Sequence, residues 1–147
     1  MNVYITYFYN IRFFPKNLIP VSTAMYDPKW YHDFKSNDTM FKDKRGILNG
    51  LRAEMLSPYK IESIECKNCS SNKDPSICTF IKQYHDYIFS LDFNKVYNWL
   101  LDISHKCNDA DICLMVYEKP DNPCSERSTL VEWFANNGVT LMEFSKS

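Results

Sequence analysis

Two spacings of hydrophobic residues alternate along the chain and predict strands and helices in turn. The continuous apolar run at residues 112–117 has the length of a strand, and the lack of alternation is typical of a strand covered on both faces. Alternating β-branched and aromatic residues predict further strands at 3–9, 21–25 and 139–144. The chain therefore carries four predicted strands, with 112–117 as the most buried.

Helical spacing is clearest in the second half of the chain. Asp74 and Pro75 predict a helix start, and the helix extends to about Ser90 with apolar residues three and four apart, namely Ile77, Phe80, Ile81, Tyr84 and Ile88. Asp92 predicts the cap of a second helix. A third helix follows residues 112–117, with Ser125 as its N-cap and Gly138 at its C-terminal end.

The order of these elements predicts an α/β fold. Strands followed by helices, then a strand, a helix and a strand, indicate a Rossmann-like sheet that is at least partly parallel and flanked by helices. The 147 residues, 45% of them hydrophobic, suit a single domain spanning 1–147. In residues 29–58 the apolar residues follow neither the strand spacing nor the helix spacing. The lysines, arginines and two glycines of this segment could hold phosphate, and a solvated loop is the alternative.

Charge and composition restrict the classes of function. The formal net charge of −1 excludes a strongly basic nucleic-acid-binding protein, although not a local basic patch. No apolar run is long enough for a transmembrane helix, and the first residues do not resemble a secretory signal. The six cysteines are scattered, which argues against a disulfide framework. We therefore expect a cytoplasmic protein without a membrane partner.

A chemically rich loop joins the strand at 112–117 to the helix after it. Parallel sheets bind ligands at the carboxyl ends of their strands, and a helix start with an arginine favours an anion. We expect an anion or nucleotide site here with a second contribution from the strand at 21–25, and its candidate ligand-binding residues are Ser22, Ser125, Arg127 and Ser128.

Two residues of this region have candidate catalytic roles. Glu118 could act as a general base or hold a ribose hydroxyl, and a lowered pKa at the helix start could make Cys124 a nucleophile. Only two residues separate Cys124 from Arg127, which disfavours phosphatase chemistry. The alternative is a capped helix start in which Arg127 pairs with Glu118 or Glu126 and Cys124 is inert. The sequence does not decide whether the chain is an enzyme.

A second cysteine cluster suggests a metal site. Cys66 and Cys69 have the spacing that places two thiolates on one zinc ion, with Cys78 as a third ligand and His85 as the fourth. Cys107 or His105 could equally supply the fourth ligand. The alternatives are free loop cysteines or a redox pair, so zinc is the only cofactor that the sequence suggests.

The region after the central strand also resembles a known family. Tyr117, Glu118, Lys119 and Pro120 end the strand, a loop with Cys124 and Arg127 follows, and Val131, Glu132, Trp133 and Phe134 lie in the next helix. This arrangement resembles the bacterial and phage family called domain of unknown function 488, in which a Cys-His-Arg triplet starts the helix. Similar features occur around Val21, Pro28, Trp30, Pro58 and Cys78.

The resemblance implies a Rossmann-like fold and no settled activity. Counting back from Glu132 places Arg127 on the family arginine, Glu126 on its histidine and Ser125 on its cysteine. A histidine-dependent mechanism is therefore not expected in this chain.

Two hypotheses of function follow from these features. The first is a protein, either a binding protein or an enzyme, that binds a phosphate-bearing ligand such as a nucleotide or a nucleic-acid end. The second is a non-catalytic, phage-encoded interaction protein whose zinc-stabilised cysteine loop binds a host protein or nucleic acid. Metal analysis and ligand binding separate the two.

Overall fold

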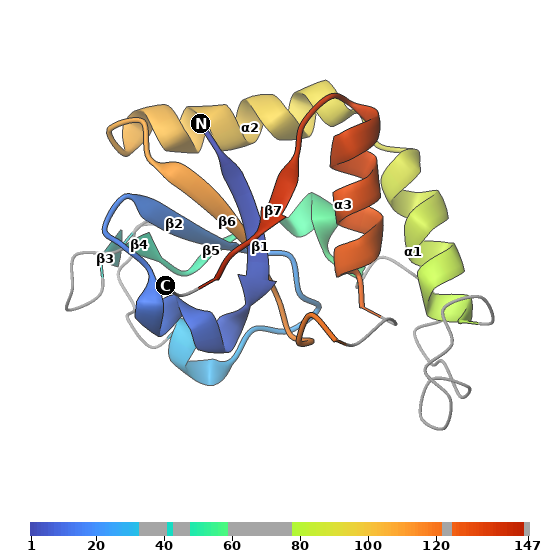
Figure 1. Cartoon of the computed structure of the whole chain (residues 1–147), viewed down its shortest axis with the longest axis horizontal. Helices are drawn as coiled ribbons and strands as arrows, with labels where there is room; N and C mark the ends of the chain where they lie inside the picture. Colours follow the sequence, from blue (N-terminus) through green and yellow to red (C-terminus); the bar gives the residue numbers. More distant parts are fainter. Residues whose placement is uncertain (33–40, 43–47, 59–77, 122–124, 146–147) are drawn as a thin grey trace.

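Five parallel strands form the main sheet, in the order β5-β2-β6-β1-β7 (Figure 1). The structure, a computed structural model, describes residues 1–32, 41–42, 48–58, 78–121 and 125–145. The strands of the sheet are β1 (Val3–Tyr7), β2 (Leu18–Ser22), β5 (Leu51–Arg52), β6 (Asp111–Val116) and β7 (Leu141–Glu143). The predicted α/β fold with a parallel sheet is confirmed, and the parallel pairing includes all five strands.

The strand β6 occupies the centre of this sheet. It pairs with β1 on one side, where Ile5 lies opposite Leu114, and with β2 on the other, where Val21 lies opposite the same residue. Residues 112–116 are buried on both faces. The prediction of a fully covered strand is confirmed for residues 112–116, whereas Tyr117 lies beyond β6 and is exposed.

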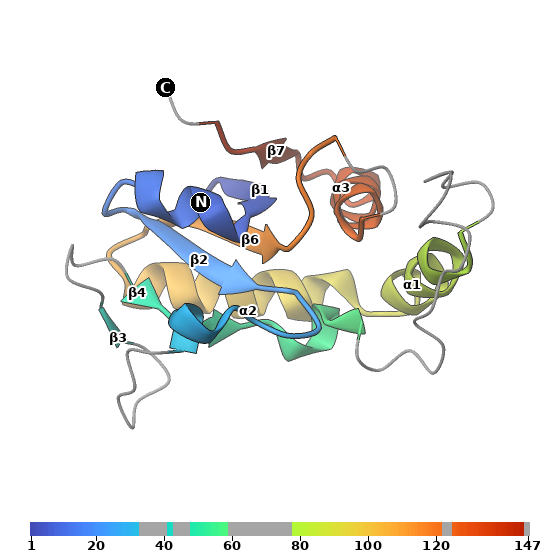
Figure 2. The ribbon, with the colours of Figure 1, turned by 90° about the horizontal axis from the view of Figure 1, so that it is seen from below.

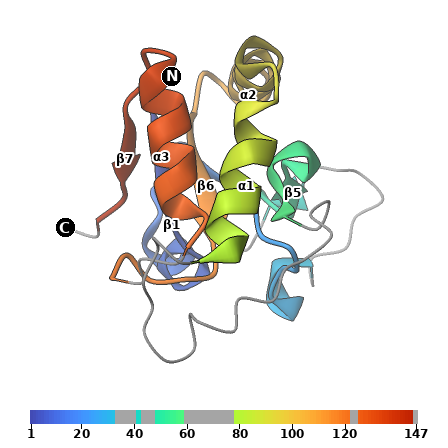
Figure 3. The same ribbon diagram turned by 90° about the vertical axis from the view of Figure 1, so that its right-hand side faces the viewer.

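Three α-helices cover one face of the sheet: α1 (Thr79–Phe89), α2 (Phe93–Lys106) and α3 (Arg127–Asn136). The views in Figure 2 and Figure 3 show these helices on one side, with α1 and α3 next to each other. Their buried side chains form one core with Ile112, Leu114 and Val116 of β6. None of the helices in the described part of the chain is long and apolar enough to span a membrane.

Short 3-10 helices cover the opposite face. These are η1 (Phe8–Phe13) and η2 (Lys29–His32), and a third, η3 (Glu54–Leu56), follows β5. Phe8, Ile11 and Tyr31 pack there against Cys113 and Met115, which alternate with the helix-facing residues of β6. A small antiparallel pair, β3 (Phe41–Lys42) with β4 (Leu48–Asn49), lies outside the main sheet.

The predicted strand at 21–25 is placed wrongly, because β2 begins three residues earlier and contains Pro20. Proline cannot donate to a sheet ladder and is usually confined to edges. Here the pairing with β5 begins only at Val21, and the Tyr31 hydroxyl fills the gap beside Pro20. It donates to Leu51 O at 2.6 Å and lies 3.2 Å from Pro20 O. A buried tyrosine thus replaces the missing strand contact.

Several predicted boundaries also change. The first strand ends at Tyr7, where η1 begins, and the last strand is limited to Leu141–Glu143. Cys78 has an extended backbone, and its Sγ accepts a hydrogen bond from Ile81 N at 3.5 Å, so α1 starts at Thr79; the predicted start at Asp74 and Pro75 lies outside the described residues. Asp92 caps α2 as predicted, with Oδ1 3.0 Å from Asn94 N.

Gly138 ends α3 in the expected way. Its φ of +80° is in the left-handed region, and its N–H donates to Ala135 O at 3.0 Å. The chain then turns directly into β7, which pairs with β1.

Candidate functional site

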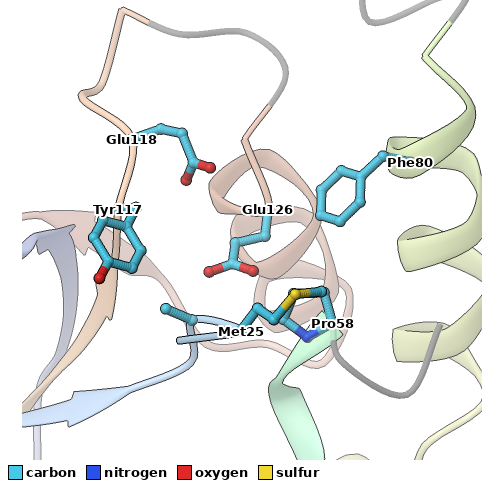
Figure 4. A pocket seen from close by; sticks show the side chains of 7 residues that line it. Met25, Pro58, Phe80, Tyr117, Glu118 and Glu126 are labelled. Carbon is cyan, nitrogen blue, oxygen red and sulfur yellow. The ribbon is translucent and has the colours of Figure 1, made fainter. Parts of the chain in front are cut away.

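A pocket of about 240 Å³ opens where the carboxyl ends of β2 and β6 meet the first turns of α1 and α3 (Figure 4). Its lining residues come from four segments of the chain: Ala24, Met25, Pro58, Phe80, Tyr117, Glu118 and Glu126. Carboxyl ends of parallel strands are where open α/β sheets bind their ligands. The pocket therefore lies at the edge of the sheet that the sequence predicts, and Glu118 is one of its walls.

Glu126 is the most unusual group of this pocket. The residue is 4% exposed and lies immediately before α3, and Figure 4 shows its carboxyl group directed into the pocket. Burial raises the pKa of Glu126 well above its usual range, and the neighbouring charge of Glu118 raises it further. Glu126 is thus a group that holds a proton more strongly than an exposed carboxyl does.

Thr23 supplies a hydrogen-bond partner for both protonation states of Glu126. Its Oγ1 lies 3.2 Å from Glu126 Oε1 and 3.0 Å from the Met115 carbonyl oxygen. The hydroxyl has one proton. It can donate that proton to an ionised Glu126, or donate to Met115 and accept from a neutral Glu126. Met115 O keeps the Thr23 N–H at 3.0 Å in either case. Glu126 can therefore gain or lose its proton without losing its partner.

Glu118 is the second carboxyl group of the pocket. It follows β6 directly and is half-buried. Its Oε2 accepts a hydrogen bond from Ser125 Oγ at 3.3 Å, and the same Ser125 Oγ accepts from Arg127 N at 3.0 Å. Ser125 thus joins the start of α3 to Glu118. The predicted N-cap at Ser125 is wrong by one residue, because Glu126 occupies the cap position of α3 and Ser125 lies just before it.

Arg127 does not line the pocket. Its Nη1 donates to the Glu118 carbonyl oxygen at 2.9 Å, and its Nε lies 2.7 Å from Glu143 Oε1 on β7. The Nε–H does not point at that oxygen, so the contact is an ion pair without a proper hydrogen bond. Arg127, which was predicted to bind an anionic ligand, thus points toward the edge of the sheet and pairs with a carboxylate there.

Ser22 belongs to a polar network behind the pocket. It is buried and bonds through its hydroxyl to Asp27, whose Oδ1 lies 2.6 Å from Arg52 Nη1. Arg52 Nη2 donates to Ala24 O at 2.9 Å, and Ser57 Oγ donates to the same oxygen at 3.1 Å. These bonds fix the loop that carries Ala24 and Met25, so Ser22 positions a wall of the pocket and does not line it.

Two aromatic rings form opposite walls. Tyr117 is 48% exposed and packs against Phe8, with 5.2 Å between ring centroids. Phe80 stacks on Tyr84 at 5.8 Å, and the Tyr84 hydroxyl donates to Leu56 O at 2.6 Å. Figure 4 shows Tyr117 and Phe80 on two sides of the glutamates. The pocket consequently combines flat aromatic walls with the carboxyl groups of Glu118 and Glu126.

The remaining candidates lie elsewhere. Ser128 is exposed on α3, and its hydroxyl lies 3.4 Å from Ser125 O. Cys66, Cys69 and Cys124 lie outside the described residues, so their predicted roles stay predictions. Cys78 is buried at the start of α1, and the His85 ring stacks on Phe89 with 4.0 Å between centroids. Within the described segments, no three His, Cys, Asp or Glu side chains could hold a metal together.

Glu126, Thr23 and the two aromatic walls were not predicted as site residues. The sequence contained one signal for Glu126, which is its place at the histidine of the family pattern. Burial of Glu126 arises from segments distant in sequence, such as Pro58 and Phe80. No local pattern could reveal it.

Comparisons with known proteins add no identification: no family model, curated protein or solved structure matches the chain significantly. The resemblance to the domain of unknown function 488 family stays a prediction. The fold and the pocket therefore define the class to which the chain is assigned, an α/β protein with a two-carboxyl pocket at the carboxyl edge of a parallel sheet.

Proposed function

We propose that this chain binds the flat, uncharged part of a nucleotide-like ligand, its base, in the pocket and that Glu126 exchanges a proton with it. The observation that carries the proposal is a buried carboxyl group with a raised pKa that faces a pocket with aromatic walls. Perturbed carboxyl groups in clefts are typical of proton-transfer sites.

The size and walls of the pocket support a planar ligand. About 240 Å³ accommodates one heterocyclic ring and no large ligand. A ring between Tyr117 and Phe80 would gain stacking contacts of about 1–3 kcal/mol. Met25 and Pro58 supply an apolar floor.

The two carboxyl groups support a ligand that donates hydrogen bonds. A neutral carboxyl group offers one donor and one acceptor, which matches the edge of a base that has a ring nitrogen beside an amino or carbonyl group. Glu118 adds an acceptor on the same side of the pocket. A phosphate group, by contrast, would face two acids there, because Arg127 and Arg52 are both paired with carboxylates.

This proposal keeps the ligand class of the sequence prediction and changes how the ligand is held. The base enters the pocket and the phosphate stays outside it. As an enzyme, Glu126 would pass its proton to a ring nitrogen or carbonyl oxygen, and Glu118 would stabilise the positive charge that forms.

Ligand-induced thermal stabilisation tests the proposal. A panel of nucleobases, nucleosides and nucleotides is compared over a pH series with the wild type, Glu126→Gln and the exposed control Asp102→Asn. We expect nucleosides and their nucleotides to stabilise the wild type by similar amounts at equal concentration, and we expect Glu126→Gln to flatten the pH dependence of binding. Stabilisation by nucleotides and inorganic phosphate, but not by nucleosides, would overturn the proposal.

A further inference from the structure

The two carboxyl groups of the pocket differ in how far they lie from solvent. Glu126 is 4% exposed, whereas Glu118 is half-buried and is followed directly by the exposed residues 119–121. Figure 4 shows both carboxyl groups between Tyr117 and Phe80. A ligand in the pocket therefore has Glu118 beside its more exposed end and Glu126 beside its buried end.

The volume of the pocket decides which part of a nucleoside lies beside each carboxyl group. About 240 Å³ holds one heterocyclic ring, so the sugar stays outside when the base is bound. The bond between the base and the first carbon of the sugar then lies at the opening of the pocket. Glu126 consequently faces the base, and Glu118 lies at the end where the sugar begins.

The surroundings of the two glutamates suit them to opposite roles. Ser125 Oγ accepts a hydrogen bond from Arg127 N and donates its own proton to Glu118 Oε2 at 3.3 Å. Glu118 is an acceptor in this bond, as a general base must be. Glu126 holds a proton strongly, because burial and the charge of Glu118 both raise its pKa. One carboxyl group can therefore give a proton while the other takes one.

The ionised form of Glu126 also has partners. Thr23 Oγ1, at 3.2 Å, can donate to the carboxylate, and the charges of Arg127 and Arg52 favour the ionised form. When Glu126 loses its proton in the same step in which Glu118 gains one, the two groups are never charged together. This avoids the repulsion between like charges in a small pocket. The pair is suited to a reaction that adds one proton to the ligand and removes one from water.

We infer that the pocket hydrolyses the bond between a nucleobase and its sugar, with Glu126 as the general acid and Glu118 as the general base. This inference rests on the proposed function, because it requires the base in the pocket. Glu126 gives its proton to the base, and the electron pair of the breaking carbon–nitrogen bond passes to the base nitrogen. One water molecule adds to the sugar carbon and loses a proton to Glu118. The products are the free base and the free sugar, and the proton returns from Glu118 to Glu126 through solvent.

Release of free base from nucleosides and nucleotides tests the inference, with nitrophenyl riboside as a comparison substrate. Nitrophenolate leaves without a proton, whereas a nucleobase needs one. We expect the wild type to release base and sugar in equal amounts. Glu126→Gln should lower kcat for nucleosides at least about 100-fold and change the hydrolysis of nitrophenyl riboside little. Glu118→Gln should lower both activities about 100-fold, and the exposed control Asp102→Asn should change neither.

The pH profile separates a chemical role of Glu126 from a structural one. Activity on nucleosides should fall as the pH rises through the raised pKa of Glu126, because the acid is then ionised. Activity on nitrophenyl riboside should not show this fall. Free nucleobases should still stabilise both glutamine variants against heat, which shows that the variants fold. Equal losses of both activities in Glu126→Gln would overturn its assignment as the acid.

Binding and cleavage together distinguish this inference from the proposed function. Nucleobases that stabilise the wild type while no nucleoside or nucleotide is cleaved would overturn the inference and leave the base pocket intact. Nucleobases that neither stabilise the protein nor are released from nucleosides would overturn both. Cleavage that requires inorganic phosphate would overturn the hydrolysis, because phosphate and not water would then accept the sugar.

Discussion

Replacing Glu126 with glutamine removes one titrating group from the pocket and keeps its size and shape. The carboxyl group is 4% exposed, and burial raises its pKa in the folded protein well above the value of about 4.3 for an unfolded glutamate. Between those two pKa values the folded chain holds a proton that the unfolded chain has released. The contribution of Glu126 to stability is therefore complete below about pH 4.3 and is lost as the pH rises toward the folded pKa.

The size of this effect follows from the single proton. Each pH unit within the window changes the free energy of unfolding by about 1.4 kcal/mol. Across that window the wild type should therefore lose stability relative to Glu126→Gln, by about 1.4 kcal/mol for each pH unit. For a chain of this length that difference corresponds to about 3–6 °C in Tm.

Urea denaturation at half-unit steps of pH measures this difference directly. The other titrating groups are common to both proteins and cancel when the two curves are subtracted. Asp102→Asn removes an exposed carboxylate from α2 and should leave the slope of the wild type unchanged. Wild-type and Glu126→Gln curves that run parallel over the whole range would refute the assignment of a raised pKa to Glu126.

Three further predictions concern the rest of the molecule. Tyr31→Phe should destabilise the fold by about 1–2 kcal/mol in urea denaturation, because Leu51 O loses its buried donor; an unchanged midpoint would mean that water replaces the hydroxyl. Glu143→Gln should cost about 1–2 kcal/mol, less than a fully buried pair, because it removes the counter-charge of Arg127 at a partly exposed site; a stabilised variant would contradict this. The zinc prediction requires about one zinc per purified chain by atomic absorption and its loss in Cys66→Ser, and it fails for a metal-free protein.

The sequence predicts best those elements whose signal is local. The apolar run of β6 and the Asp92 cap of α2 are visible in neighbouring residues, and both are confirmed. The boundary of β2 could not be predicted in the same way, since Pro20 argues against a strand wherever a neighbour needs its N–H. Only the distant Tyr31 makes that position acceptable.

The same distinction holds for the site. The sequence places Glu118 at the end of a buried strand, and the structure brings it into the pocket. Arg127 was expected to face a ligand because it lies at a helix start. The direction of its side chain instead depends on Glu143, which lies sixteen residues later on the edge strand β7. The spacing of residues along the chain does not indicate where β7 lies in the sheet. Pairings across the sheet therefore decide which charged groups remain available for a ligand.

The central place of β6 also has a consequence for how the chain acquires its structure. Strands β1 and β2 are made first, yet they do not pair with each other, because β6 lies between them. During synthesis, two apolar strands must therefore wait for about ninety more residues before either gains its principal neighbour, with contacts of high sequence separation that slow folding. Until then their open edges are free to pair wrongly or with other chains. A chain truncated before Asp111 would leave exposed the edges of β1 and β2 that β6 normally covers, and a separate fragment that begins just before Asp111 should restore the sheet by filling the vacant position.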